Sequence, residues 1–290
     1  MQLIVNVNGE FLDIENARLS VKDRGFMYGD GLFETLRARR NSVFRLQAHM
    51  ERLLKAAEEL DIPLPISIQE IEKRIHQTLD KNELEDAIVR VQLTRGEDEP
   101  GLLPSPFTSA TLVVVVRPYQ PPPENFYSKG VSICTIPNSA AITSLSNHRI
   151  KTTNYLVNIL LKKKAEERKC YEAIALTPQG FLTEGTVTNI FLVQNKAIHT
   201  PTLGPFVMDG ITRRLIRETS RNEGISFNDR DLSHDEGFKA NEIFLTNTGI
   251  GVLPVTSFDG QTVGDGSPGP VTCRIRESYL KIFDTEMGSC

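Results

Sequence analysis

The sequence lacks any apolar run of the length that a membrane helix requires. Such a helix needs about 20 consecutive, mostly apolar residues, and no window of the 290 residues approaches that length. The first residues, MQLIVNVNGEFLDIE, also lack the basic start and the long apolar core of a secretory signal. We therefore expect neither a membrane segment nor an exported leader.

Cysteine and histidine are too few and too scattered to indicate a metal centre. The four cysteines are Cys134, Cys170, Cys273 and Cys290, with no C-x-x-C pair, and the five histidines occur singly. Structural zinc and a disulfide framework both need clustered or paired ligands. We expect no metal, and the cysteine pattern predicts a reducing, cytoplasmic location.

Positive charge is not in excess. The chain has 33 Lys and Arg against 37 Asp and Glu, which gives a net charge of −4 without a basic stripe. A protein that binds nucleic acid as its main partner usually carries such a stripe, so we do not expect that partner. The remaining composition, 39% apolar and 24% charged, is typical of a globular protein whose length suits two domains.

A proline-rich stretch divides the chain into two lobes. RPYQPPPENF holds three consecutive prolines and favours neither helix nor sheet, so we predict an interdomain linker at residues 120–126. Residues 1–119 show two hairpin patterns, two segments of helical periodicity and two further strands, which predicts a small α+β domain. Residues 127–290 mix strands with helices that begin near residues 154, 210 and 270. The fold class is therefore mixed α and β.

Lys151 precedes one of these helices, in the segment IKTTNYL. A lysine becomes an amine nucleophile when burial or a neighbouring cation lowers its pKa, and Schiff-base formation is the usual result. Most lysines, however, are solvated surface residues. A functional role for Lys151 therefore depends on what accompanies it.

Glu184 stands in a second polar segment, LTEGTVTNIF. Because Gly and Thr are common in turns, the segment is compatible with a polar hairpin turn. It is also compatible with a carboxylate that faces a pocket beside hydroxyl donors.

Two further stretches resemble anion sites. Gly210 precedes an amphipathic helix in DGITRRLIRETS, so the free amides of Ile211 and Thr212 would lie at a helix N-terminus, where phosphates bind. Thr248 follows a strand in FLTNTGIGVLPV. Each could be an ordinary turn, but a lysine, a carboxylate and two phosphate-type turns together indicate a phosphorylated aldehyde cofactor.

The chain resembles the class IV (fold type IV) pyridoxal-phosphate enzymes over nearly its whole length. This family includes branched-chain aminotransferases, D-amino acid aminotransferases and 4-amino-4-deoxychorismate lyases. The resemblance rests on HMERL, IKTTNYL, LTEGTVTNIF, DGITR and TNTGIGVLPV, several of which follow one another along the chain in that family's order. It implies two domains with the cofactor between them, a larger C-terminal domain with a β-barrel-like core flanked by helices, and a homodimer.

The same motifs imply roles for individual residues. Lys151 would form the Schiff base with pyridoxal phosphate and shuttle the proton. Glu184 would keep the pyridine nitrogen protonated. The phosphate would be bound by Arg52, Ile211, Thr212 and Thr248, and Tyr155 would contact the ring hydroxyl unless it is a core residue of its helix.

The entry motif DRGFMYGDGLFETLR and the strand VRVQLTRG resemble the D-amino acid aminotransferases and the lyases more than the branched-chain enzymes. The short spacing from Lys151 to Asn154 does the same. Against the first of these groups, the acidic EDEPGL stands where their Arg-x-His carboxylate trap would be. Arg90 could bind a substrate carboxylate instead, or be a solvated strand residue, and Phe33 could line the pocket or belong to the core.

The leading interpretation is a ping-pong aminotransferase that moves an amino group between an amino acid, either a D-amino acid or an aliphatic or branched-chain one, and a 2-oxo acid. The alternative is a lyase that gives 4-aminobenzoate and pyruvate. A non-catalytic binding protein is a third class, but retention of Lys151 and Glu184 argues against it. The preferred donor and its handedness stay open.

Overall fold

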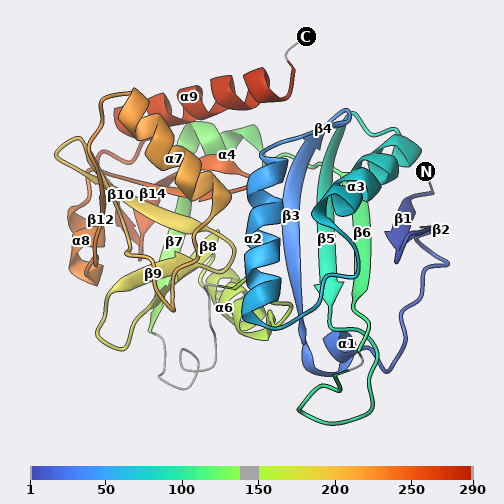
Figure 1. Cartoon of the computed structure of the whole chain (residues 1–290). Helices are drawn as coiled ribbons and strands as arrows, with labels where there is room; N and C mark the ends of the chain where they lie inside the picture. The colour runs from blue at the N-terminus through green and yellow to red at the C-terminus, as the bar shows by residue number, and fades with distance from the viewer. Residues whose placement is uncertain (1, 107, 138–149, 289–290) are drawn as a thin grey trace. The chain divides into compact units, whose positions relative to one another are not determined.

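The computed structural model describes residues 2–106, 108–137 and 150–288 (Figure 1). His148 and Cys290 lie outside these ranges. Contacts between residues divide the chain into two compact units. The first comprises Met1–Gln120, Ile150–Asn154 and Glu286–Cys290, and the second comprises Pro121–Arg149 and Tyr155–Thr285. Lys151 therefore groups with the N-terminal residues.

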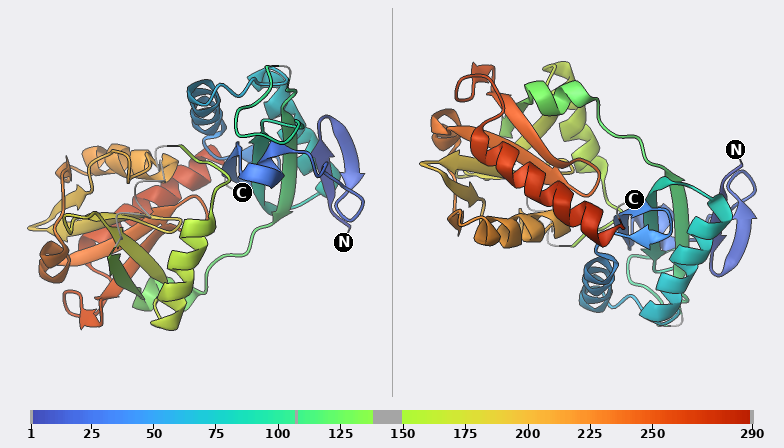
Figure 2. Two further views of the ribbon diagram at one scale, coloured as in Figure 1. Left: turned by 90° about the horizontal axis from the view of Figure 1, so that it is seen from below. Right: turned by 90° about the horizontal axis from the view of Figure 1, so that it is seen from above.

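The first unit is an antiparallel sheet covered by helices. Its strand order is β2-β1-β6-β5-β3-β4, and the β1–β2 hairpin forms one end (Figure 2). The strands are β1 Ile4–Val7, β2 Glu10–Asp13, β3 Gly31–Arg39, β4 Ser42–Val43, β5 Asp86–Thr94 and β6 Thr111–Pro118. The helices are α1 Arg24–Tyr28, α2 Leu46–Glu59 and α3 Ile68–Asn82. Both predicted hairpins and both predicted long helices are confirmed.

Alternation along the strands separates the two faces of this sheet. On β5, Ala87, Val89, Val91 and Leu93 are buried in the core beneath α2 and α3, which lie on one face of the sheet (Figure 1). Because successive strand residues point to opposite faces, Arg90 lies on the other face. On β3 the same rule places Leu32 and Leu36 toward the helices and Phe33 away from them.

The second unit is built on a nine-stranded mixed sheet with the main order β12-β11-β10-β13-β14-β7-β8-β9. It is curled, because β9 bonds β8 and also contacts β10. The strands are β7 Val131–Pro137, β8 Glu172–Leu176, β9 Leu182–Gly185, β10 Asn189–Gln194, β11 Ala197–Thr200, β12 Phe227–Asp229, β13 Glu242–Asn247, β14 Gly251–Phe258 and β15 Gln261–Thr262. The helices are α4 Glu124–Lys129, α6 Leu156–Glu167, α7 Ile211–Asn222, α8 His234–Lys239 and α9 Pro270–Glu286. The expected mixture of α and β structure is confirmed.

The proline-rich stretch lies between β6 and α4. Residues 119–123 belong to neither a helix nor a strand, but α4 begins at Glu124. The last three residues of the predicted 120–126 linker are therefore helical, and Pro118 still belongs to β6. A helix can start directly after Pro123 because proline suits the residue just ahead of the first turn, where no N–H needs an intrahelical partner. Among the described residues, no helix is long and apolar enough to cross a bilayer.

Candidate active site

Lys151 is held by the edge of β3 and not by the helix that follows it. The amide of Phe33 donates to the carbonyl of Lys151, and the amide of Thr153 donates to the carbonyl of Gly31, both at 2.9 Å. Helix α6 begins only at Leu156. The backbone of Lys151 is therefore fixed as if it were an additional strand residue.

A turn at Gly29 holds the end of the Lys151 segment in place. The Thr153 hydroxyl donates to the Gly29 carbonyl at 2.8 Å. Gly29 has a φ of +68°, and a Cβ at this position would lie 2.0 Å from Asn154 Oδ1. Only glycine fits both the backbone angle and this contact. The Y-G-D-G segment therefore packs closely against the K-T-T-N segment.

Phe33 brings two cations together beside this segment. Lys151 Nζ lies 4.4 Å from the centre of the Phe33 ring, and Arg90 Cζ lies 3.7 Å from it. Phe33 is buried but lies outside the core beneath the helices. Arg90 is half-buried and its Nε donates to Gln92 Oε1 at 3.4 Å. The structure thus places a carboxylate-binding type of side chain against the same aromatic ring as the amine of Lys151.

Arg52 is paired with a buried carboxylate that the sequence interpretation missed. Glu34 on β3 accepts bonds of 2.7 Å from Arg52 Nε, Arg52 Nη2 and His49 Nδ1. Burial raises the pKa of Glu34, but the Arg52 charge and the bonds from Arg52 and His49 outweigh it and hold that pKa well below its usual range. Burial also lowers the pKa of His49, against the influence of Glu34.

The spacing along α2 explains this network. His49 and Arg52 are three residues apart, so they share one face of the helix. Glu34 lies on the strand face that α2 covers. A carboxylate among apolar strand residues was the signal for a buried ion pair, because such a residue is rarely buried without a partner.

Glu184 is a buried carboxylate of the second unit and, like Glu34, accepts hydrogen bonds from its neighbours. It is buried on β9, and its Oε2 accepts from the Met208 amide at 2.7 Å and from Asn189 Nδ2 at 3.3 Å. The Asn189 amide also donates to the Met208 carbonyl at 3.0 Å. A Cβ at Gly210 would lie 2.2 Å from Asn189 Oδ1. Glycine at this position lets the chain pass the Asn189 amide into α7.

The start of α7 is suited to an anion. Its N-cap, Gly210, provides no side-chain cap, and Ile211 and Thr212 are buried in its first turn. Thr246 on β13 pairs in register with Asn189, and its buried hydroxyl forms no hydrogen bond within the described part of the chain. An uncapped helix N-terminus and an unsatisfied buried hydroxyl on this side of the unit fit a phosphate group.

Thr248 and Tyr155, the other two predicted cofactor-binding residues, lie in the chain close to Thr246 and to Asn154. Thr248 is in the turn between β13 and β14, which Asn247 stabilises by accepting from the Gly249 and Ile250 amides at 2.8 Å. Tyr155 is half-buried and is the N-cap residue of α6 rather than part of its interior. Within the described residues, no group of three or more His, Cys, Asp or Glu side chains is arranged to hold a metal ion.

The predicted residues therefore form two groups, each described within its own unit. Lys151, Phe33 and Arg90 meet in the first unit, where Arg52 joins the Glu34 network. In the second unit Glu184 connects to the segment that leads into α7, and Thr246, which the sequence interpretation did not select, lies in register with Asn189 on the neighbouring strand.

Comparisons with known proteins agree on one family. Residues 31–258 match the pattern of the family described as "Amino-transferase class IV". The chain is 32% identical to a putative branched-chain-amino-acid aminotransferase of Methanocaldococcus jannaschii, over 96% of each chain. It is also 32% identical to the D-alanine aminotransferase of Bacillus licheniformis, over 93% of each. Among solved structures, the branched-chain amino acid aminotransferase from Escherichia coli is similar with a TM-score of 0.90 and 28% identity, covering 100% of this chain and 97% of that one.

Proposed function

The chain belongs to the class IV aminotransferases, which depend on pyridoxal phosphate, and we propose that Lys151 carries the proton transfers of its amino-group exchange. The observation that carries this proposal is the pairing of Lys151 with the edge of β3, which holds its amine over the Phe33 ring that Arg90 also contacts. A side chain positioned in this way can act as a general acid and base on a substrate held next to it.

The cofactor would supply an aldehyde that accepts the amino group and a ring that withdraws electrons. Lys151 would hold it covalently, and Glu184 would keep a proton at the ring nitrogen. The first-turn amides of Ile211 and Thr212, together with Thr248 and Arg52, would bind its phosphate, and Tyr155 would contact the ring hydroxyl. The uncapped start of α7 and the unsatisfied Thr246 hydroxyl support this assignment.

During the reaction Lys151 Nζ would take the α-proton of the amino acid and return it to the carbon that receives the amino group. The donor leaves as a 2-oxo acid, and a second 2-oxo acid takes the amino group by the reverse path. Lys151 must be neutral to accept the proton.

The substrate would be an amino acid whose carboxylate binds Arg90 and whose side chain contacts Phe33. Its side chain would be small, aliphatic or branched, which agrees with the activities named for the relatives. The relatives and the solved structure reported above are all named as aminotransferases. This agreement does not favour the lyase alternative. The acidic loop EDEPGL supports Arg90 as the carboxylate-binding residue, because that loop offers no cation.

We also propose a homodimer in a reducing, cytoplasmic setting. Helix α6 exposes Leu156, Ile159 and Leu160 on one face, with exposed fractions of 68%, 60% and 50%. Such a row of large apolar side chains is typical of an interaction surface. Cys134, Cys170 and Cys273 are free thiols. Sedimentation velocity of the Leu160→Glu variant tests the dimer, which should shift toward monomer.

Borohydride reduction of the holoenzyme tests the role of Lys151. Reduction should fix the cofactor to a peptide that contains Lys151, and Lys151→Ala should lose this adduct. Lys163→Ala, which changes an exposed lysine of α6, is the control and should keep it. Loss of the visible band on addition of D- or L-amino acids one at a time then identifies the donor and its handedness. A trapped adduct that survives in Lys151→Ala would overturn the assignment.

A further inference from the structure

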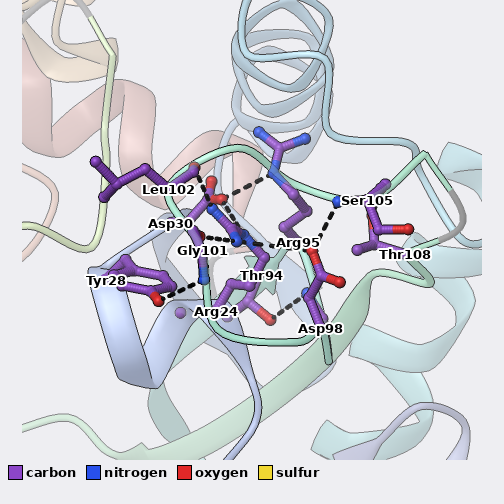
Figure 3. Close-up of polar contacts among 12 residues, drawn as sticks. Arg24, Tyr28, Asp30, Thr94, Arg95, Asp98, Gly101, Leu102, Ser105 and Thr108 are labelled. Carbon is purple, nitrogen blue, oxygen red and sulfur yellow. Dashed lines mark hydrogen bonds and ion pairs between the residues drawn. The ribbon is translucent and has the colours of Figure 1, made fainter.

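Asp30 connects two arginines that the proposed chemistry does not use (Figure 3). Its Oδ2 accepts from Arg24 Nε at 2.9 Å and from Arg95 Nε at 2.8 Å. Arg24 is 2% exposed and Arg95 is 9% exposed. Burial raises the pKa of Asp30, but the bonds from Arg95 and Arg24 outweigh it and lower that pKa. Asp30 therefore stays charged at neutral pH.

Each arginine also donates to backbone carbonyls, and Arg24 Nη1 lies 3.6 Å from Asp98 Oδ2. Arg24 Nη1 and Nη2 donate to the carbonyls of Gly101 and Leu102, both at 2.8 Å. Arg95 Nη1 and Nη2 donate to the carbonyls of Asp61 and Leu60 at 2.7 and 2.8 Å. The Asp30 carboxylate thus orients two guanidinium groups, one of which binds the loop after β5 and the other the end of α2.

The backbones of these motifs also interlock. The Arg24 amide donates to the Gly96 carbonyl at 2.8 Å, and the Arg95 amide donates to the Asp30 carbonyl at 3.1 Å. The Thr94 hydroxyl donates to the buried Asp23 at 2.8 Å. The segments D-R-G, G-D-G and T-R-G therefore form one unit, which we call the Asp30 clamp: Asp23–Gly25, Gly29–Gly31 and Thr94–Gly96.

The clamp is directly continuous with the strand that holds Lys151. Gly31 follows Asp30 in the chain, and its carbonyl accepts from Thr153. Two residues later, Phe33 binds the Lys151 carbonyl and contacts its amine. A shift of Asp30 would therefore displace the strand edge on which the Lys151 segment is built.

We propose that Asp30 is a positioning residue for the amino-transfer site, which anchors the 97–105 loop through Arg24 and the end of α2 through Arg95, and which sets the position of Lys151 through Gly31. The effect on catalysis rests on the proposed function of Lys151. The anchoring of the two backbone segments does not, because it follows from the hydrogen bonds within the first unit alone.

Hydrogen exchange of the holoenzyme, followed by mass spectrometry, separates the contributions of the two arginines. Asp30→Asn should raise exchange in peptides that cover residues 97–105 and 58–63 by about tenfold, which corresponds to the loss of a charge-assisted bond. Arg24→Lys should raise it only in residues 97–105, and Arg95→Lys mainly in 58–63, because one ammonium cannot replace a three-point fork. These lysine variants keep the charge and provide the test if Asp30→Asn does not fold.

Glu99→Gln is the matched control in the same loop. It removes the exposed pair between Lys22 and Glu99 at 2.7 Å, whose side chains are 55% and 80% exposed. Exposed pairs contribute little, so exchange should change by less than about twofold. If Asp30→Asn exchanges like Glu99→Gln, the clamp does not anchor these segments and the proposal is wrong.

Kinetics and the visible spectrum test the link to Lys151. Asp30→Asn should lower kcat more than it changes KM, and it should shift the pH midpoint of the holoenzyme's visible band, whereas Glu99→Gln should change neither. Faster exchange with an unchanged kcat and an unchanged midpoint would refute the positioning role. If the wild-type enzyme transfers no amino group, the proposed function fails, but the exchange and spectral measurements still decide whether the clamp acts on Lys151.

Discussion

Replacing Glu34 by glutamine tests the buried network that holds Arg52. Glu34 is 1% exposed and binds Arg52 twice and His49 once. Glutamine has nearly the same shape but no charge, so the Arg52 guanidinium loses its counter-ion. Removing one partner of a buried pair costs about 3–5 kcal/mol. Because the Arg52 side chain is 12% exposed, water compensates part of this loss, and we expect about 3 kcal/mol.

Differential scanning calorimetry measures this effect with and without added cofactor. A loss of about 3 kcal/mol should lower the melting temperature by roughly 10 °C in a unit of this size. The control is Glu85→Gln, which removes the exposed pair with Arg40 at 3.0 Å and should cost less than about 1 kcal/mol. Equal melting temperatures of Glu34→Gln and Glu85→Gln would refute the reasoning.

A double variant separates the pair from its surroundings. Arg52→Met in the Glu34→Gln background removes both charges, and paired replacement of a buried ion pair by uncharged groups is often nearly neutral. The double variant should therefore be more stable than the sum of the single effects predicts, by at least about 1 kcal/mol. Simple additivity would show that the two side chains do not stabilise each other.

Three further predictions concern pH and the second unit. Because the pKa of Glu34 is lowered in the folded state, its contribution to stability is complete above the ordinary pKa of about 4.3 and is lost as the pH falls below it. The free energy of unfolding measured in urea should therefore fall more steeply in acid for wild type than for Glu34→Gln, and parallel curves would contradict this. Gly210→Ala places a Cβ 2.2 Å from Asn189 Oδ1 and should weaken pyridoxal phosphate binding about tenfold in a spectral titration, whereas Gly204→Ala, where a Cβ meets nothing within 4 Å, should not. Thr246→Val should leave unfolding within about 1 kcal/mol of wild type but lower cofactor affinity, and the reverse pattern would show that the hydroxyl is structural.

Periodicity in the sequence predicted most of the regular elements of the first unit. The alternation around Asn8-Gly9 and the apolar spacing of α2 and α3 are local signals, and they correspond to β1–β2 and to both helices. Helix α1 was not predicted, because its sequence, RGFMY, has too few residues for a period. Its start is fixed instead by Asp23, which caps the helix at Gly25 and binds Thr94, 71 residues away.

Side-chain chemistry in the sequence identified candidate site residues, but it did not predict the tertiary contacts that hold them in place. Lys151 was expected ahead of a helix, and α6 does follow it. Its pairing with Phe33 joins residues 118 positions apart, and such register is set by tertiary packing, not by local sequence. Arg52 was selected as a phosphate ligand from its motif, whereas its bonds to Glu34 could be inferred only with β3 and α2 placed together.

The alternation of β3 explains how one short segment serves several purposes. Leu32 enters the core beneath the helices, and Glu34 turns to the same side and binds Arg52. Phe33 lies on the opposite face, where it contacts Lys151 and Arg90. A register slip of one residue would exchange these two sets, leaving a carboxylate beside Lys151 and an aromatic ring facing Arg52. The Asp30 clamp lies immediately before this segment, and its bonds to Arg24 and Arg95 oppose such a slip.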